Sequence, residues 1–161
     1  MRRQMSFHVQ MLFFALLPVL LLSSCKKGLD VHFVDGTVTL DGQPFQHVVV
    51  SFHPIEGTEG RLAFASTDEK GYYRISTLGG KSGAGATLGK YAVGFSKEIP
   101  AGRQPTEEDK VANPNWESSG KYDLDKFDEL APKKYVNPKT SGFTITVEKG
   151  KNHFNFDLLS K

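Results

Sequence analysis

Four carboxylates lie within seven residues, Asp123–Glu129, and form a dense group of possible metal ligands. Calcium takes about six to eight oxygen ligands, which a calcium-binding loop places at every second residue, with a glycine at its sharp turn. The acidic stretch meets neither condition fully. Part of its charge would be neutralised by four nearby lysines: Lys121, Lys126, Lys133 and Lys134. We therefore predict no metal site, and keep a cation bound to 123–129 as the open alternative.

Serine and histidine side chains alternate along Gln46–His53, where Ser51, His53 and His47 are expected on one strand face. A nucleophile and its base need hydrogen-bond contact, but residues two apart on a strand are separated by about 7 Å along its axis. No G-x-S-x-G turn is present. Four histidines lack the close spacing of zinc ligands: His32, His47, His53 and His153. We predict no catalytic residues and no zinc.

The segment Gly79–Gly83 (GGKSG) contains the Gly-Lys-Ser end of a nucleotide-binding loop. That motif needs a glycine at position 75, where this chain has Ile75, and a helix after the serine, of which the sequence gives no sign. Gly83–Gly89 likewise misses the spacing of the dinucleotide fingerprint by one residue. We interpret the region as a glycine-rich connection between strands, and predict no cofactor.

Three aromatic residues lie in a long polar stretch between Ile99 and Leu130: Trp116, Tyr122 and Phe127. Exposed aromatic side chains can stack on sugar rings or anchor a protein partner, and long loops on a rigid scaffold often carry function. The alternative is that they fix the loop to the domain. These three residues are the candidate binding residues.

The elements that present these side chains begin after a short leader. Residues 1–10 include Arg2 and Arg3 and no acid, and Met11–Leu22 is an uninterrupted apolar run of twelve residues. A transmembrane helix needs roughly 20 apolar residues, and this run is shorter and contains Pro18. A basic start, a short apolar middle and a small-residue end indicate a secretory signal peptide, residues 1–24.

The only cysteine, Cys25, follows this run directly, with Leu22 three residues before it and Ser24 just before it. This pattern resembles the lipobox of bacterial lipoproteins. The resemblance implies cleavage between Ser24 and Cys25, a diacylglycerol on the Cys25 sulfur, and usually a third acyl chain. Each buried CH₂ contributes about 0.8 kcal/mol, so two or three chains hold a protein on a bilayer. We expect a protein on the outer side of a bacterial membrane.

Charge excludes some partners. Without Arg2 and Arg3 the 20 basic residues of the chain fall to 18, equal to its 18 acidic residues. A chain with no net charge gives no indication of nucleic-acid binding. Its length of 161 residues suits one domain.

After a polar tether, 25–30, the pattern is short and alternating, with turn residues at regular intervals such as Asp41-Gly42 and Asp68–Gly71. Such a pattern is typical of antiparallel strands. The sequence predicts an all-β, seven-stranded antiparallel sandwich over 31–161. The strands are expected at Gly36–Leu40, Gln46–His53, Leu62–Ser66, Tyr72–Thr77, Tyr91–Ser96, Phe143–Val147 and Phe154–Leu158. The stretch 99–130 is expected to be an irregular insert.

Three segments resemble the carboxypeptidase regulatory-like family, also called transthyretin-like or prealbumin-like. They are Gly36–Pro44 (GTVTLDGQP), Thr67–Tyr73 (TDEKGYY) and Gly85–Val93 (GATLGKYAV). The tail, Pro132–Asn152, resembles a bacterial lipoprotein branch of that family. The resemblance implies an Ig-like or transthyretin-like sandwich that serves as an accessory or interaction module.

Together these observations predict a lipid-anchored, non-enzymatic envelope protein that acts in adhesion, scaffolding or binding, with envelope proteins or glycans as partners. One alternative is a carbohydrate-binding module that uses the aromatic residues of the insert. A transthyretin-like hydrolase is a second, disfavoured alternative.

Overall fold

The computed structural model describes residues 28–55, 59–102, 106–107, 110 and 123–161. The predicted leader, the lipid-attachment residue Cys25 and the aromatic residues Trp116 and Tyr122 lie outside this part of the chain. The described residues contain no helix long and apolar enough to cross a membrane.

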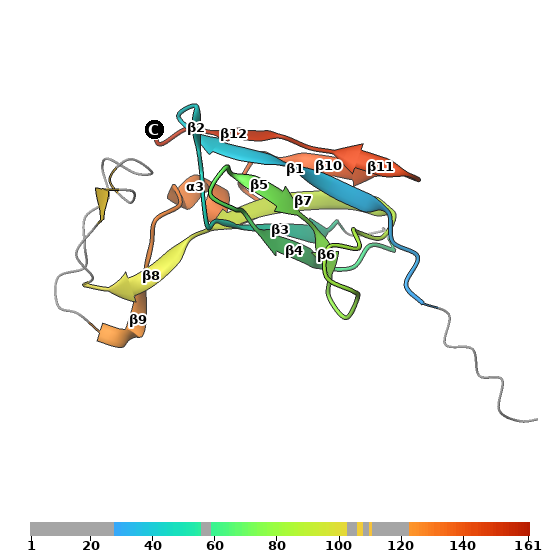
Figure 1. Ribbon diagram of the computed structural model, residues 1–161, viewed down its shortest axis with the longest axis horizontal. Helices are drawn as coiled ribbons and strands as arrows, with labels where there is room; N and C mark the ends of the chain where they lie inside the picture. The colour runs from blue at the N-terminus through green and yellow to red at the C-terminus, as the bar shows by residue number, and fades with distance from the viewer. Residues whose placement is uncertain (1–27, 56–58, 103–105, 108–109, 111–122) are drawn as a thin grey trace, which may run out of the picture.

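Strands dominate the described chain (Figure 1). They are β1 (Phe33–Leu40), β2 (Gln43–Pro44), β3 (Val49–Pro54), β4 (Ala63–Ser66), β5 (Tyr72–Arg74), β6 (Ser76–Thr77), β7 (Gly89–Ser96), β8 (Glu98–Ala101), β9 (Asp123–Glu129), β10 (Thr144–Val147), β11 (Lys151–His153) and β12 (Phe156–Leu158). One helical turn, α3 (Lys133–Val136), precedes β10. The all-β prediction is confirmed.

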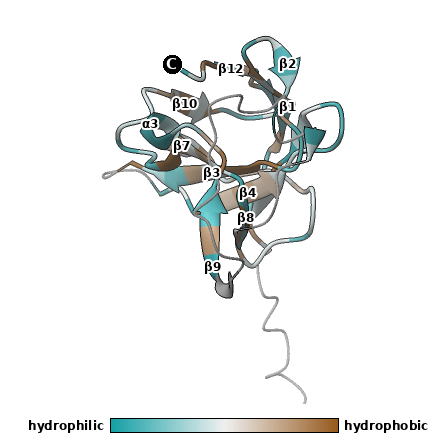
Figure 2. Ribbon diagram, turned by 90° about the vertical axis from the view of Figure 1, so that its left-hand side faces the viewer, coloured by the Kyte–Doolittle hydropathy of each residue, from teal (hydrophilic) through white to brown (hydrophobic). Residues whose placement is uncertain are grey.

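Two five-stranded sheets form a sandwich. In the first, β1 is central, with β11 and β12 on one side and β2 and β5 on the other. The second has the order β10-β7-β3-β4-β6. Figure 2 shows β1 and β12 on one side of the sandwich, across from β3, β4 and β7. A separate ribbon, β8-β9, extends from one end.

Pairing departs from the predicted antiparallel arrangement at β1, which runs parallel to both β11 and β12. Alternation identifies a strand but carries no information on the direction of its partner, so the sequence pattern could not predict this. The predicted strand Tyr72–Thr77 also divides, because β5 pairs with β1 in one sheet and β6 pairs with β4 in the other. For such reasons the described chain has twelve strand segments where the pattern suggested seven.

The core lies between the sheets and is rich in aromatic rings. Phe52, on β3, is fully buried and lies about 6 Å, centroid to centroid, from the rings of Tyr73, Tyr91, Phe154 and Phe156. The pair with Tyr91 is tilted and the other three are edge-to-face, a packing that contributes about 0.5–1.5 kcal/mol per pair beyond area burial. The inward positions expected on β3, β5 and β7 are buried: Val50, Phe52, Tyr73, Tyr91, Val93 and Phe95.

Gly36 allows the residues between β11 and β12 to lie close against the main chain of β1. A Cβ at Gly36 would lie 1.8 Å from the carbonyl oxygen of Phe154. That oxygen accepts a 2.7 Å hydrogen bond from the Tyr73 hydroxyl. Only glycine leaves room for the Phe154 carbonyl to approach the main chain of β1 so closely.

Candidate functional site

The two ends of the predicted insert form a two-stranded ribbon. Glu98, Ile99 and Pro100 on β8 pair with Glu129, Asp128 and Phe127 on β9, and the register shifts at Ala101. The prediction that 99–130 is irregular throughout is therefore wrong at its ends. Within the described residues β8 pairs with β9 alone, and such an edge strand accommodates Pro100, whose missing N–H would interrupt a central strand.

Burial differs between the side chains of the ribbon. Ile99 and Leu130 are buried near the end where the ribbon leaves the sandwich, and Ala101, at the far end of β8, is buried as well. Phe127 is 59% exposed and is the most exposed of the large hydrophobic side chains in the described chain. Of the three aromatic residues predicted to bind a partner, the structure thus describes one, and presents it to solvent.

The acidic stretch has a structural role at its last residue. Glu129 Oε1 accepts hydrogen bonds from the main-chain N–H groups of Lys97 (2.7 Å) and Ala131 (2.8 Å). Its Oε2 accepts a hydrogen bond from the Ser96 hydroxyl. We call this set the Glu129 clamp. It fixes the return of the insert to the end of β7, and so sets where the ribbon leaves the sandwich.

The structure does not bring His47, Ser51 and His53 together on one strand face. His47 has a φ of 55° and precedes β3, so it does not share the strand face of Ser51 and His53. The Ser51 hydroxyl donates a 3.3 Å hydrogen bond to the carbonyl of Gly94, and partial burial lowers the pKa of His53. Within the described residues no three His, Cys, Asp or Glu side chains gather closely enough to hold a metal ion.

A row of charged side chains that the sequence analysis did not single out crosses the outer face of the first sheet. Asp35 on β1 is in register with Arg74 on β5 and His153 on β11. Asp35 accepts hydrogen bonds from the Tyr72 hydroxyl (2.9 Å) and His153 Nδ1 (2.8 Å). Burial raises the pKa of Asp35, but these hydrogen bonds and the charges of His153 and Arg74 outweigh it, so the net pKa falls below 3.8.

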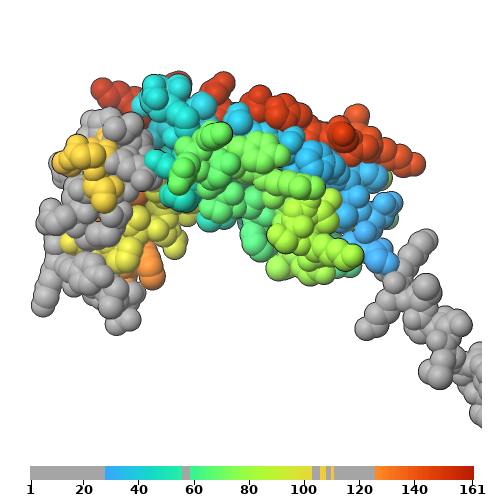
Figure 3. Space-filling view, viewed as in Figure 1, coloured from blue at the N-terminus to red at the C-terminus, as the bar shows by residue number. Residues whose placement is uncertain are grey.

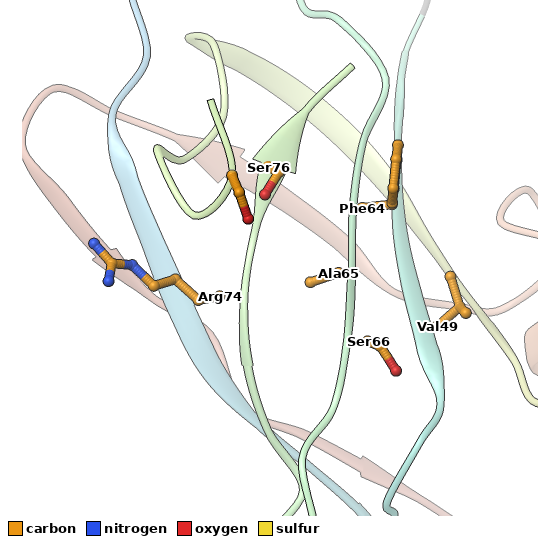
Figure 4. A pocket seen from close by; sticks show the side chains of 7 residues that line it. Val49, Phe64, Ala65, Ser66, Arg74 and Ser76 are labelled. Atoms are coloured by element: carbon orange, nitrogen blue, oxygen red, sulfur yellow. The ribbon is translucent and has the colours of Figure 1, made fainter. Parts of the chain in front are cut away.

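A groove lies between β4 and the chain that runs from β5 to β6 (Figure 4). Its volume is about 450 Å³, and its lining residues are Val49, Phe64, Ala65, Ser66, Arg74, Ser76 and Ser82. Phe64 and Val49 are 43% and 42% exposed. The Arg74 side chain extends away from β4 and over β1, where its guanidinium lies 4.7 Å from the centre of the Phe33 ring.

The glycine-rich connection closes one end of this groove. The main-chain N–H of Gly83 donates to the Ser76 hydroxyl at 2.7 Å, and Gly85 exchanges main-chain hydrogen bonds with Ile75 and Thr77. β7 follows, and no helix, so the connection is not a nucleotide-binding loop. The sequence analysis did not predict this groove. It forms because β5 and β6 pair with different sheets, and the alternation of polar and apolar residues does not show which sheet a strand joins.

No protein-family model, curated protein or solved structure matches this chain.

Proposed function

We propose that this chain is a lipid-anchored, non-enzymatic binding module on the outer side of a bacterial membrane. The leader 1–24 directs export, and acylation of Cys25 holds the domain on the bilayer. The observation that carries the proposal is the position of the ribbon relative to the start of the domain. The first described residues and the β8-β9 ribbon lie at opposite ends of the long axis (Figures 1 and 3).

This arrangement suits a binding module that is held by one end. Cys25 is three residues before Gly28, so a lipid anchor would keep the N-terminal end of the sandwich near the bilayer. The ribbon would then project away from the membrane, with Phe127 accessible to an envelope partner. Trp116 and Tyr122, the other two predicted binding residues, lie outside the described residues.

The clamp supports this role because a binding loop loses less entropy when its scaffold holds it in place. Glu129 fixes one strand of the ribbon to β7 through Ser96 and Lys97. Ile99 and Leu130 are buried next to the clamp. The exposed part of the ribbon is thus presented on a fixed base.

Photo-crosslinking in intact cells tests the proposal. A photoreactive amino acid replaces Phe127 in the full chain, and a control chain carries it at the exposed Lys149, in the turn before β11. We expect a discrete crosslinked product from position 127 that is absent from position 149 and is lost when Cys25 is changed to alanine. Equal crosslinking from both positions, or none from position 127, would contradict the proposal. Crosslinking of 127 to glycan material alone would favour the carbohydrate-binding alternative.

A further inference from the structure

Two connections flank the start of β1, where the chain enters the sandwich. The glycine-rich connection between β6 and β7 lies on one side, since a Cβ at Gly80 would lie 3.8 Å from Leu29 Cδ1. The same connection forms a β-bridge from Ala86 to His32. The turn between β10 and β11 lies on the other side, where the Gly150 N–H donates a 3.2 Å hydrogen bond to His32 Nδ1. Figure 3 shows both connections at the end of the molecule where the described chain begins. We call residues 28–32, 78–82 and 148–151 the tether end.

The tether end presents one large apolar side chain and three basic side chains to solvent. Leu78 is 55% exposed at the start of the glycine-rich connection, and Lys81, three residues later, is also exposed. Lys149 and Lys151, in the turn and at the start of β11, are exposed as well. Among the described residues, none of these three lysines forms an ion pair with a carboxylate. An apolar side chain set among lysines is typical of a surface that lies against a bilayer.

Charge is distributed unevenly along the chain that would remain after removal of the leader. The two residues before the tether end are both lysines, which makes five lysines there against two carboxylates, Asp30 and Glu148. In the neighbouring connection between β3 and β4, the exposed Glu59 and Arg61 have opposite charges and balance each other. Because this chain has 18 basic and 18 acidic residues, the rest of it is net negative. An anionic surface would therefore attract the tether end and repel the remainder.

A lipid on Cys25 would hold these side chains within reach of the charge of a bilayer. Gly28 is three residues after Cys25, and three extended residues span at most about 11 Å. The charge of a membrane surface acts over about 8 Å at physiological ionic strength. Each lysine that reaches this layer on an anionic leaflet strengthens binding about fivefold, which corresponds to about 1 kcal/mol.

We propose that the tether end is a second membrane contact, which binds the anionic headgroups of phospholipids; this inference rests on the lipid anchor of the proposed function. Lys81, Lys149 and Lys151 meet lipid phosphates, and Leu78 enters the layer between the headgroups and the acyl chains. The contact holds the long axis of the sandwich upright on the bilayer. A short tether alone leaves the domain free to tilt, whereas this contact directs the ribbon away from the membrane.

Photo-crosslinking of the full chain to lipid tests this proposal. The chain is purified from bacterial membranes and reconstituted in vesicles of phosphatidylcholine, alone or mixed with the anionic phosphatidylglycerol. A photoreactive amino acid replaces Leu78 or, as a matched control, Leu159, which is also 55% exposed but follows β12 at the opposite end of the molecule (Figure 1). We expect position 78 to give about fivefold more lipid adduct with phosphatidylglycerol than without it, which is the effect of one fully engaged lysine. Position 159 should give no lipid adduct in either vesicle.

Charge variants test the role of the lysines. With the photoreactive residue kept at position 78, Lys81→Gln together with Lys149→Gln should abolish the gain of adduct from phosphatidylglycerol. Lys70→Gln together with Lys139→Gln removes the same charge from exposed positions outside the tether end, and should leave that gain unchanged. Salt at about 1 M, where the Debye length falls to about 3 Å, should also abolish the gain.

Mass spectrometry of the N-terminal peptide from the same sample separates this inference from the proposed function. The inference is overturned if position 78 gives no more lipid adduct than position 159, or if its adduct is the same with and without phosphatidylglycerol. When Cys25 is acylated in that sample, such a result leaves the lipid anchor intact. An unmodified Cys25 together with phosphatidylglycerol-dependent adducts at position 78 would instead overturn the anchor and support the membrane contact.

Discussion

The clamp at Glu129 predicts a difference between two substitutions of one residue. Glu129→Ala removes the acceptor of three hydrogen bonds, two of them from the main-chain N–H groups of Lys97 and Ala131. Lys97 is 6% exposed and Ala131 is 3% exposed, so water replaces these bonds poorly. An unsatisfied buried donor costs about 1–3 kcal/mol. We therefore expect Glu129→Ala to lower the free energy of unfolding by about 3 kcal/mol.

Glu129→Gln keeps most of the clamp. The amide oxygen can still accept both main-chain N–H groups, and the amide nitrogen can donate to the Ser96 hydroxyl, which is also an acceptor. Only the charge assistance is lost, which we expect to cost about 1 kcal/mol.

Urea unfolding of a soluble chain that begins at residue 26 measures both changes, and an unchanged m-value shows that they are changes in stability. The reasoning is refuted if the alanine variant loses less than about 0.5 kcal/mol, or if glutamine costs as much as alanine. Hydrogen exchange localises the effect, because the Leu130 amide, which donates to the Lys97 carbonyl at 2.9 Å, should exchange faster in the alanine variant.

Three further predictions concern the sandwich. Gly36→Ala should lower the free energy of unfolding by about 3 kcal/mol or prevent folding, because the new Cβ would meet the Phe154 carbonyl. Gly28→Ala is the control, since a Cβ there has nothing within 4 Å and should leave stability unchanged. Thermal unfolding compares the two variants. Tyr73→Phe should cost about 1 kcal/mol in urea unfolding, because it removes the hydrogen bond to the Phe154 carbonyl. Asp35 has a folded-state pKa below its ordinary 3.8, so its contribution to stability is present above that pH and is lost as pH falls through the folded-state value. Asp35→Asn should therefore flatten the loss of stability below about pH 4, and an unchanged acid limb would refute this.

The sequence predicted the inward residues of several strands because alternation follows directly from the pleat. Val50 and Phe52 on β3, and Tyr91, Val93 and Phe95 on β7, are buried as expected. Alternation did not settle which face of β4 is inward, because Ala63 is buried and the larger Phe64 is 43% exposed. Which of these two residues faces inward depends on the space left by the opposite sheet, and the local sequence pattern does not contain that information.

Contacts between residues that are far apart in the chain could not be predicted from the sequence pattern. Asp35 and His153 are far apart in the chain, and only the parallel pairing of β1 with β11 brings them together. The groove depends on the divergence of β5 from β4, and the clamp on Glu129 returning to Ser96. The sequence identified the acidic stretch as a possible cation site. The structural role of its last carboxylate, Glu129, depends on hydrogen bonds from Ser96 and Lys97, which the local pattern does not contain.

Mass spectrometry of the N-terminal peptide of the chain, purified from bacterial membranes, tests the central proposal most directly. We expect a peptide that begins at Cys25 and carries the mass of a diacylglycerol on its sulfur. A chain that retains residues 1–24, or one with an unmodified Cys25 thiol, would contradict membrane display by a lipid anchor.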